Sequence, residues 1–238
     1  MKTYLISSII ALAMGSLTLA SQALASDAPD TVVELFTSQG CSSCPPANKF
    51  VSSLADDPNK LVLSYGVTYW DYLGWEDTFG SPEFTKRQRV YGKAFRSGNI
   101  YTPQIVLNGS DHNSRYSKGD VAAWTLSEDR PEAVLENTPD GLVVKFNDDM
   151  DMGTVRLVLV SYMPGRHDVP VSRGENRGRT VSVSNVVRDI QTFDGQSVPD
   201  TGHVQTGLKP QSHLNYAVLV HDAQTSAILT AATYRPAS

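Results

Sequence analysis

The chain has 238 residues, of which 40% are hydrophobic and 19% are charged, and its formal net charge is −5. The length suits one large domain or two small ones. The mild acidity is spread along the chain, which argues against a nucleic-acid partner.

The first 25 residues have the pattern of an export signal. Lys2 precedes an apolar run from Leu5 to Leu19, and Ala23-Leu24-Ala25 is a small-x-small cleavage sequence. The run is short for a membrane span, and no later segment is long and apolar enough to be one. We therefore expect a signal peptide over 1–25 and a periplasmic or secreted bacterial protein without a membrane span.

The next part of the chain, 26–130, alternates between strand and helix patterns. Strands are predicted over 32–36, 61–65 and 104–107, and helices over 47–54, 84–95 and 119–126. Beyond this part, over 131–238, strand-like runs recur with turn residues between them, at 142–146, 155–162, 180–190, 215–221 and 227–234. The order predicts an α/β domain over 26–130, followed by a small all-β, sandwich-like domain over 131–238.

Cys41 and Cys44 are the only two cysteines of the chain. A disulfide between them would close too short a loop to contribute much stability. The pair lies where a predicted strand turns into a helix, which is typical of thioredoxin-like redox proteins. The helix dipole favours an anion there, so we expect Cys41 to be a solvent-accessible thiolate nucleophile and Cys44 the resolving thiol. A structural bridge and a metal site are the alternatives.

Thr102-Pro103 and Glu34 are further catalytic candidates. A proline after a threonine, at the head of the strand 104–107, predicts a cis bond opposite the dithiol, with Thr102 offering backbone groups to a substrate peptide. Glu34 lies within the first strand. Buried beneath the dithiol it would have a raised pKa and relay a proton to the resolving sulfur. Alternatively, it lies on the exposed face of a half-buried strand.

Two segments supply candidate substrate-binding residues. Trp70, Tyr72 and Trp75 would form a peptide-binding wall with Asp71 setting the charge near the sulfurs, or they would fill a domain interface. Arg173 and Arg177 belong to a basic, glycine-bearing loop. Arginine forks suit carboxylate recognition or an interdomain ion pair, and a solvated loop is the alternative.

These motifs together resemble a known family. The stretch 33–47, with the segments 69–75, 101–104, 173–179 and 185–188, resembles the secreted thioredoxin-like family catalogued as domain of unknown function 1223. The resemblance implies a thioredoxin-like domain followed by a β-rich domain, and it brings no known substrate. The chain departs from the family at 66–68, where Gly-Val-Thr replaces His-Val-Asp. It also departs at 110–115, where a polar sequence predicts a loose loop instead of a strand.

The leading hypothesis is a periplasmic thiol–disulfide oxidoreductase that acts on protein thiols or disulfides. Its dithiol is the redox group, so no bound cofactor is expected, and an unidentified partner would recycle it. One alternative is a copper-handling protein that binds Cu(I) through both cysteines and a histidine, His112 or His203. Another is a non-catalytic module that binds a partner.

Overall fold

The computed structural model describes residues 28–146, 151–195 and 202–237. The predicted signal peptide, 1–25, lies outside the described residues. Within them the elements, in chain order, are β1 (Thr31–Thr37), α1 (Cys44–Ser52), β2 (Lys60–Gly66), η1 (Asp71–Leu73), α2 (Pro82–Ala94), β3 (Gln104–Leu107), β4 (Asp111–Asn113), α3 (Lys118–Ala122), β5 (Ala133–Thr138), β6 (Gly141–Phe146), η2 (Met152–Thr154), β7 (Val155–Pro170), β8 (Thr180–Asp194), β9 (His203–Gln205), β10 (Asn215–Asp222) and β11 (Ile228–Tyr234).

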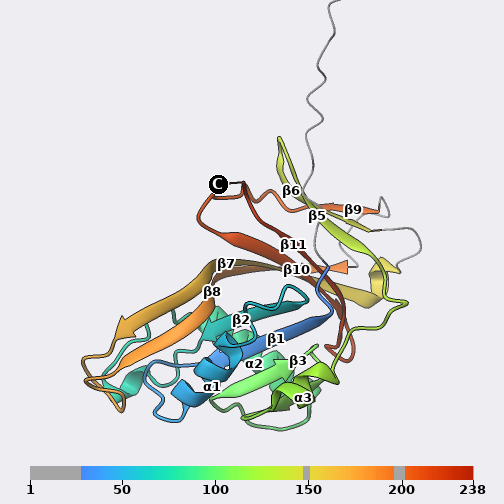
Figure 1. Ribbon diagram of the computed structural model, residues 1–238. Helices are drawn as coiled ribbons and strands as arrows, with labels where there is room; N and C mark the ends of the chain where they lie inside the picture. Colours follow the sequence, from blue (N-terminus) through green and yellow to red (C-terminus); the bar gives the residue numbers. More distant parts are fainter. Residues whose placement is uncertain (1–27, 147–150, 196–201, 238) are drawn as a thin grey trace, which may run out of the picture.

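A large mixed sheet organises the molecule (Figure 1). Eight strands lie in the order β11-β10-β7-β8-β2-β1-β3-β4, and a second sheet has the order β5-β6-β9. Strands β1 and β2 are parallel, whereas β3 is antiparallel to β1. The two halves of the chain meet where β2 pairs in parallel with β8, at Ser64 and Val186. Strands from both sides of residue 130 therefore share one sheet.

The predicted fold class, an α/β thioredoxin-like domain followed by a sandwich-like domain, is wrong. The structure is mostly β, and its described residues hold three α-helices. The long β7–β8 hairpin extends the sheet of the first half, where the prediction had it packing in a sandwich. The residue pattern indicates which segments are strands and which faces are buried, but not which strand lies beside which. Whether 26–130 and 131–238 are separate domains stays a prediction.

Most predicted elements have their observed counterparts within a few residues. The loose loop predicted over 110–115 is wrong, because Asp111–Asn113 form β4 and pair antiparallel with β3. Strands at a sheet edge pair through backbone groups and do not require apolar side chains, so the polar sequence did not exclude a strand here. The strand patterns also missed β5 and β9.

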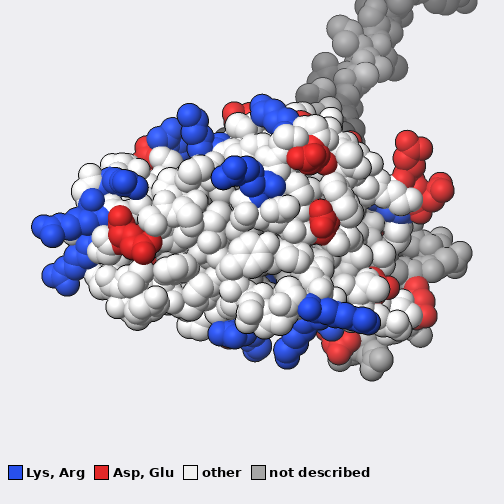
Figure 2. Space-filling model, turned by 90° about the horizontal axis from the view of Figure 1, so that it is seen from below, with Lys and Arg blue, Asp and Glu red and all other residues white. Residues whose placement is uncertain are grey.

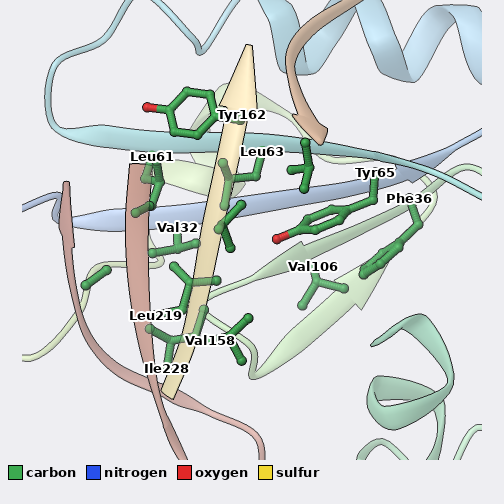
Figure 3. Packing of buried hydrophobic residues seen from close by; sticks show 14 of the residues in the cluster. Val32, Phe36, Leu61, Leu63, Tyr65, Val106, Val158, Tyr162, Leu219 and Ile228 are labelled. Carbon is green, nitrogen blue, oxygen red and sulfur yellow. The ribbon is translucent and has the colours of Figure 1, made fainter. Parts of the chain in front are cut away.

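Apolar side chains cover both faces of β1. Val33 and Leu35 pack in a cluster with α1, whereas Val32 and Phe36 pack on the other face with residues of α2. That second cluster also receives side chains from β2, β3, β7, β10 and β11, among them Leu61, Leu63, Val106, Val158, Leu219 and Ile228 (Figure 3). A strand buried on both faces reads as a nearly continuous apolar run, as β1 does. Helices α1 and α2 therefore lie on opposite faces of the sheet.

The charged side chains of the surface are mixed in sign. On the face seen from below, Lys and Arg lie at the left end and along the upper and lower edges, with Asp and Glu among them and at the right end (Figure 2). Among the described residues, no helix has both the length and the apolar character needed to cross a bilayer.

Candidate functional site

Cys41 and Cys44 form a disulfide at the beginning of α1, with their Cα atoms 5.4 Å apart. Cys44 is the first residue of α1, and prolines at 45 and 46 occupy the first turn. Proline is tolerated there because its missing N–H would have no partner within the helix. The Cys44 amide donates to the carbonyl oxygen of Cys41 at 3.2 Å, which holds the two cysteines in one tight turn.

Both cysteines are buried in this disulfide-bonded state. Cys41 is 1% exposed and Cys44 is 0% exposed. The expectation that Cys41 is accessible to solvent is therefore wrong for this state. Sequence reasoning missed the burial because the segments that cover the disulfide are distant in the chain.

One covering segment is the loop 173–179, which connects β7 to β8. Asn176 is fully buried, and its Nδ2 donates to the carbonyl oxygens of Gln39 and Cys41, both at 2.9 Å. The carboxylate of Glu175 accepts from the Ser42 amide at 3.0 Å, and this hydrogen bonding lowers the pKa of Glu175. The loop is therefore fastened to the cysteine turn on both sides of Cys41.

The two arginines that were predicted to bind substrate make none of these contacts with the cysteine turn. Arg173 and Arg177 are exposed to solvent, while Glu175 and Asn176, which the sequence analysis did not select, make the contacts. A single asparagine in a polar loop belongs to no motif or periodic pattern that would indicate a buried contact. Its role could not have been found from the sequence.

The aromatic segment supports the cysteine turn from another side. Trp70 donates from Nε1 to Thr102 Oγ1 at 2.6 Å, and Trp75 donates from Nε1 to Gln39 Oε1 at 2.9 Å. The Trp70 and Tyr72 rings are stacked with their centroids 6.5 Å apart, and Tyr72 is 78% exposed. Of the three predicted wall residues, two thus hold the site together and one faces solvent.

Two carboxylates, in the aromatic segment and just after it, differ in their surroundings. Asp71 is partly exposed and accepts from the Asp77 amide at 3.2 Å, and burial raises the pKa of Asp71. Asp77 is buried, and its carboxylate accepts from the amides of Gln39 at 2.7 Å and Phe79 at 2.9 Å. Burial raises the pKa of Asp77 to about 6. Asp77, which the sequence analysis did not select, fixes the backbone two residues before Cys41.

Thr102 and Pro103 lie beside the cysteine turn, and the peptide bond between them is cis, as predicted. Ser43 and Pro46 line a groove of about 480 Å³ together with Thr102 and Pro103. The rest of this groove comes from Ala47, Phe50, Ile105, Ser114, Arg115 and Tyr116. The structure thus brings together the cysteine turn, Thr102-Pro103 and Trp70, as the sequence analysis expected.

Glu34 does not lie beside the disulfide. It is fully buried, which excludes the exposed-strand interpretation, and it accepts from Arg87 Nε and Nη2 at 2.7 and 2.9 Å. The Tyr91 hydroxyl also donates to it. Glu34 alternates with Val33 and Leu35, which pack toward α1, so it points to the opposite face of the sheet. The structure therefore does not bring Glu34 to the disulfide.

The histidines named for the copper alternative are also separate from the cysteines. His112 is stacked on Phe95 and hydrogen-bonded through Nδ1 to the Tyr101 hydroxyl at 2.8 Å, and His203 lies in the second sheet. Within the described ranges, no group of three or more His, Cys, Asp or Glu side chains could hold a metal ion. Neither histidine therefore belongs to such a group with the cysteines.

Fold and site together define a mostly β protein with a buried disulfide between a sheet strand and a helix. Residues 32–221 match the family described as protein of unknown function DUF1223, and the chain belongs to this family. A protein from Agrobacterium tumefaciens, known from an X-ray crystal structure, is 29% identical, with 89% of this chain and 96% of that one covered and a TM-score of 0.64. HBP35 of Porphyromonas gingivalis is 14% identical, with 88% and 76% covered and a TM-score of 0.51, a likeness of fold alone. A search of curated proteins gives no match.

Proposed function

We propose that the protein exchanges disulfides with the thiols of polypeptide substrates through Cys41 and Cys44. The observation that carries this proposal is the position of the pair, at the beginning of α1 and next to the groove lined by Ser43, Thr102 and Pro103. A disulfide that closes so short a loop contributes little to stability. Reduction would leave a sulfur near the helix N-terminus, where the helix dipole favours a thiolate.

The exchange takes place in two balanced steps. A substrate thiolate attacks the sulfur of Cys41, the disulfide breaks, and Cys44 leaves with the electron pair as a thiolate. A second substrate thiolate then attacks the substrate sulfur of the mixed disulfide, and Cys41 leaves as a thiolate. The substrate is now oxidised and the protein carries two thiols. The reverse sequence reduces a substrate, and in either direction a second thiol or disulfide compound must restore the pair.

Access to Cys41 requires the covering loop 173–179 to move. Three hydrogen bonds fasten this loop to the cysteine turn, two from Asn176 and one to Glu175. Each contributes about 0.5–1.5 kcal/mol, so opening is costly but within the range of local fluctuations. Exchange therefore proceeds from a minor, open state. The groove beside the turn then receives the polypeptide.

The burial of Cys41 favours a second candidate function, that of a non-catalytic module that binds a partner. In that function the disulfide fixes the cysteine turn and does not react. Tyr72, which is 78% exposed and stacked with Trp70, would contact the partner. Large aromatic side chains are common anchors of protein interfaces.

Insulin reduction and the reactivation of scrambled ribonuclease separate the two functions. The proposal expects the wild-type protein to be active in at least one assay and the Cys41→Ser variant to be inactive. A Cys41→Ser, Cys44→Ser double variant with unchanged circular dichroism provides the control for folding. Activity that survives in Cys41→Ser would refute the mechanism. An inactive wild type with a well-folded double variant would support the binding module instead.

A further inference from the structure

A pocket of about 390 Å³ lies on the face of the sheet opposite α1. It is formed by α2 together with strands β7, β8 and β10. Its lining includes Arg87 and Val90 of α2, Arg156 of β7, Ile190 of β8 and His221 of β10. The disulfide and its covering loop contribute no residue to it, so an inference about this pocket is independent of the proposed redox function.

The floor of the pocket is a buried hydrogen-bond network around Glu34 and Arg87. Arg87 donates to both carboxylate oxygens of Glu34, and the Tyr91 hydroxyl donates to Oε2. Arg87 Nη2 also lies 3.2 Å from His221 Nε2, and His221 Nδ1 lies 2.8 Å from the carbonyl oxygen of Ser226. Burial and the charge of Arg87 lower the pKa of His221 to about 4, so the ring is neutral at pH 7. These partners assign the proton to Nδ1 and leave Nε2 as an acceptor that Arg87 occupies.

The Arg87 guanidinium at this floor has one nitrogen outside the network. Arg87 is 9% exposed, and besides the bonds already named its Nη2 donates to the Tyr91 hydroxyl at 3.0 Å. Every hydrogen bond found for Arg87 within the three described ranges is made by Nε or Nη2 and none by Nη1, although Arg87 lines the pocket. Because Arg87 is 9% exposed and lines the pocket, part of its side chain keeps contact with solvent. A guanidinium N–H in such a position is suited to an anionic acceptor.

The walls define the rest of the ligand. Arg156 lines the pocket and is partly buried, which adds a second guanidinium to the lining. Lys86 and Glu83 are at the rim and form an exposed ion pair at 3.6 Å, so their charges offset each other. Val90, which is 41% exposed, is one of the apolar lining residues, together with Val158 and Ile190. Apolar walls with a few placed polar groups are typical of small-molecule sites.

We propose that this pocket binds a small organic carboxylate that carries an apolar group. The carboxylate accepts hydrogen bonds from Arg87 Nη1 and from the Arg156 guanidinium. The apolar part of the ligand packs on Val90 and Ile190. Inorganic phosphate is a poorer ligand, because it would lose its hydration water beside apolar walls and has no apolar group to pack on them.

Isothermal titration calorimetry with benzoate as the probe tests the proposal, with benzamide and inorganic phosphate as comparisons. We expect saturable binding of benzoate and at least tenfold weaker binding of the other two, a difference of about 1.4 kcal/mol. Arg156→Gln should weaken benzoate binding about tenfold without disturbing the buried Glu34–Arg87 pair. Arg89→Gln, which removes the same charge from an exposed position of α2, is the matched control and should bind as the wild type does.

Three results would overturn the proposal: no saturable binding of benzoate, benzamide binding as tight as that of benzoate, or equal affinities of the Arg156→Gln and Arg89→Gln variants. A redox-inactive protein that still binds benzoate would refute the proposed function and leave this pocket proposal intact. The two proposals are therefore tested separately.

Discussion

Asn176→Ala should loosen the loop that covers the disulfide. The substitution removes two hydrogen bonds of 2.9 Å, to the carbonyl oxygens of Gln39 and Cys41. At about 0.5–1.5 kcal/mol for each bond, the closed state loses roughly 1–3 kcal/mol relative to the open one. Every 1.4 kcal/mol is a factor of ten in the equilibrium, so a loss of about 2 kcal/mol increases the open fraction roughly 30-fold.

The rate of reduction by dithiothreitol measures that open fraction. Aliquots are quenched with an alkylating reagent under native conditions, and mass spectrometry gives the fraction of reduced protein. We expect Asn176→Ala to be reduced about ten to a hundred times faster than the wild type, if opening precedes attack. Arg177→Ala, in the same loop but exposed, is the control and should be reduced at the wild-type rate. Equal rates for Asn176→Ala and Arg177→Ala would refute the idea that this loop controls access.

Two further predictions concern buried carboxylates. Glu34→Gln should lower the free energy of unfolding in urea by about 3–5 kcal/mol, because it leaves the Arg87 guanidinium buried without its counter-charge. Glu83→Gln, which breaks an exposed ion pair, should cost less than about 1 kcal/mol, and equal losses would contradict the reasoning. Asp77 has a pKa raised from 3.8 to about 6, so the native state binds more protons than the unfolded state between these values. The stability of the wild type relative to Asp77→Asn should therefore fall by about 2 kcal/mol as the pH rises from 4 to 6, and a constant difference would argue against a buried, titrating Asp77.

The sequence was sufficient for the local features of the site. Helical spacing after the cysteines and a continuous apolar run before them predicted α1 and β1, because these signals involve residues close in the chain. The position of the cysteine pair and the cis bond before Pro103 could be predicted for the same reason.

The long-range features could not be predicted. Asn176 contacts a carbonyl group 137 residues away, and Glu34 pairs with an arginine 53 residues away. Nothing in the identity of an asparagine or a glutamate specifies such a partner. The same limit explains the wrong fold class. The parallel pairing of β2 with β8 joins the two halves of the chain, and the residue pattern of neither strand indicates this pairing.

Trapping of a mixed disulfide tests the central claim most directly. A peptide that contains a disulfide is mixed with the reduced wild type, with Cys44→Ser and with Cys41→Ser, and mass spectrometry locates any adduct. The account predicts that Cys44→Ser accumulates a stable adduct on Cys41, while Cys41→Ser reacts far more slowly, because Cys44 is the resolving thiol of the proposed mechanism. Equal reactivity of the two variants, or no adduct with either, would contradict exchange at Cys41.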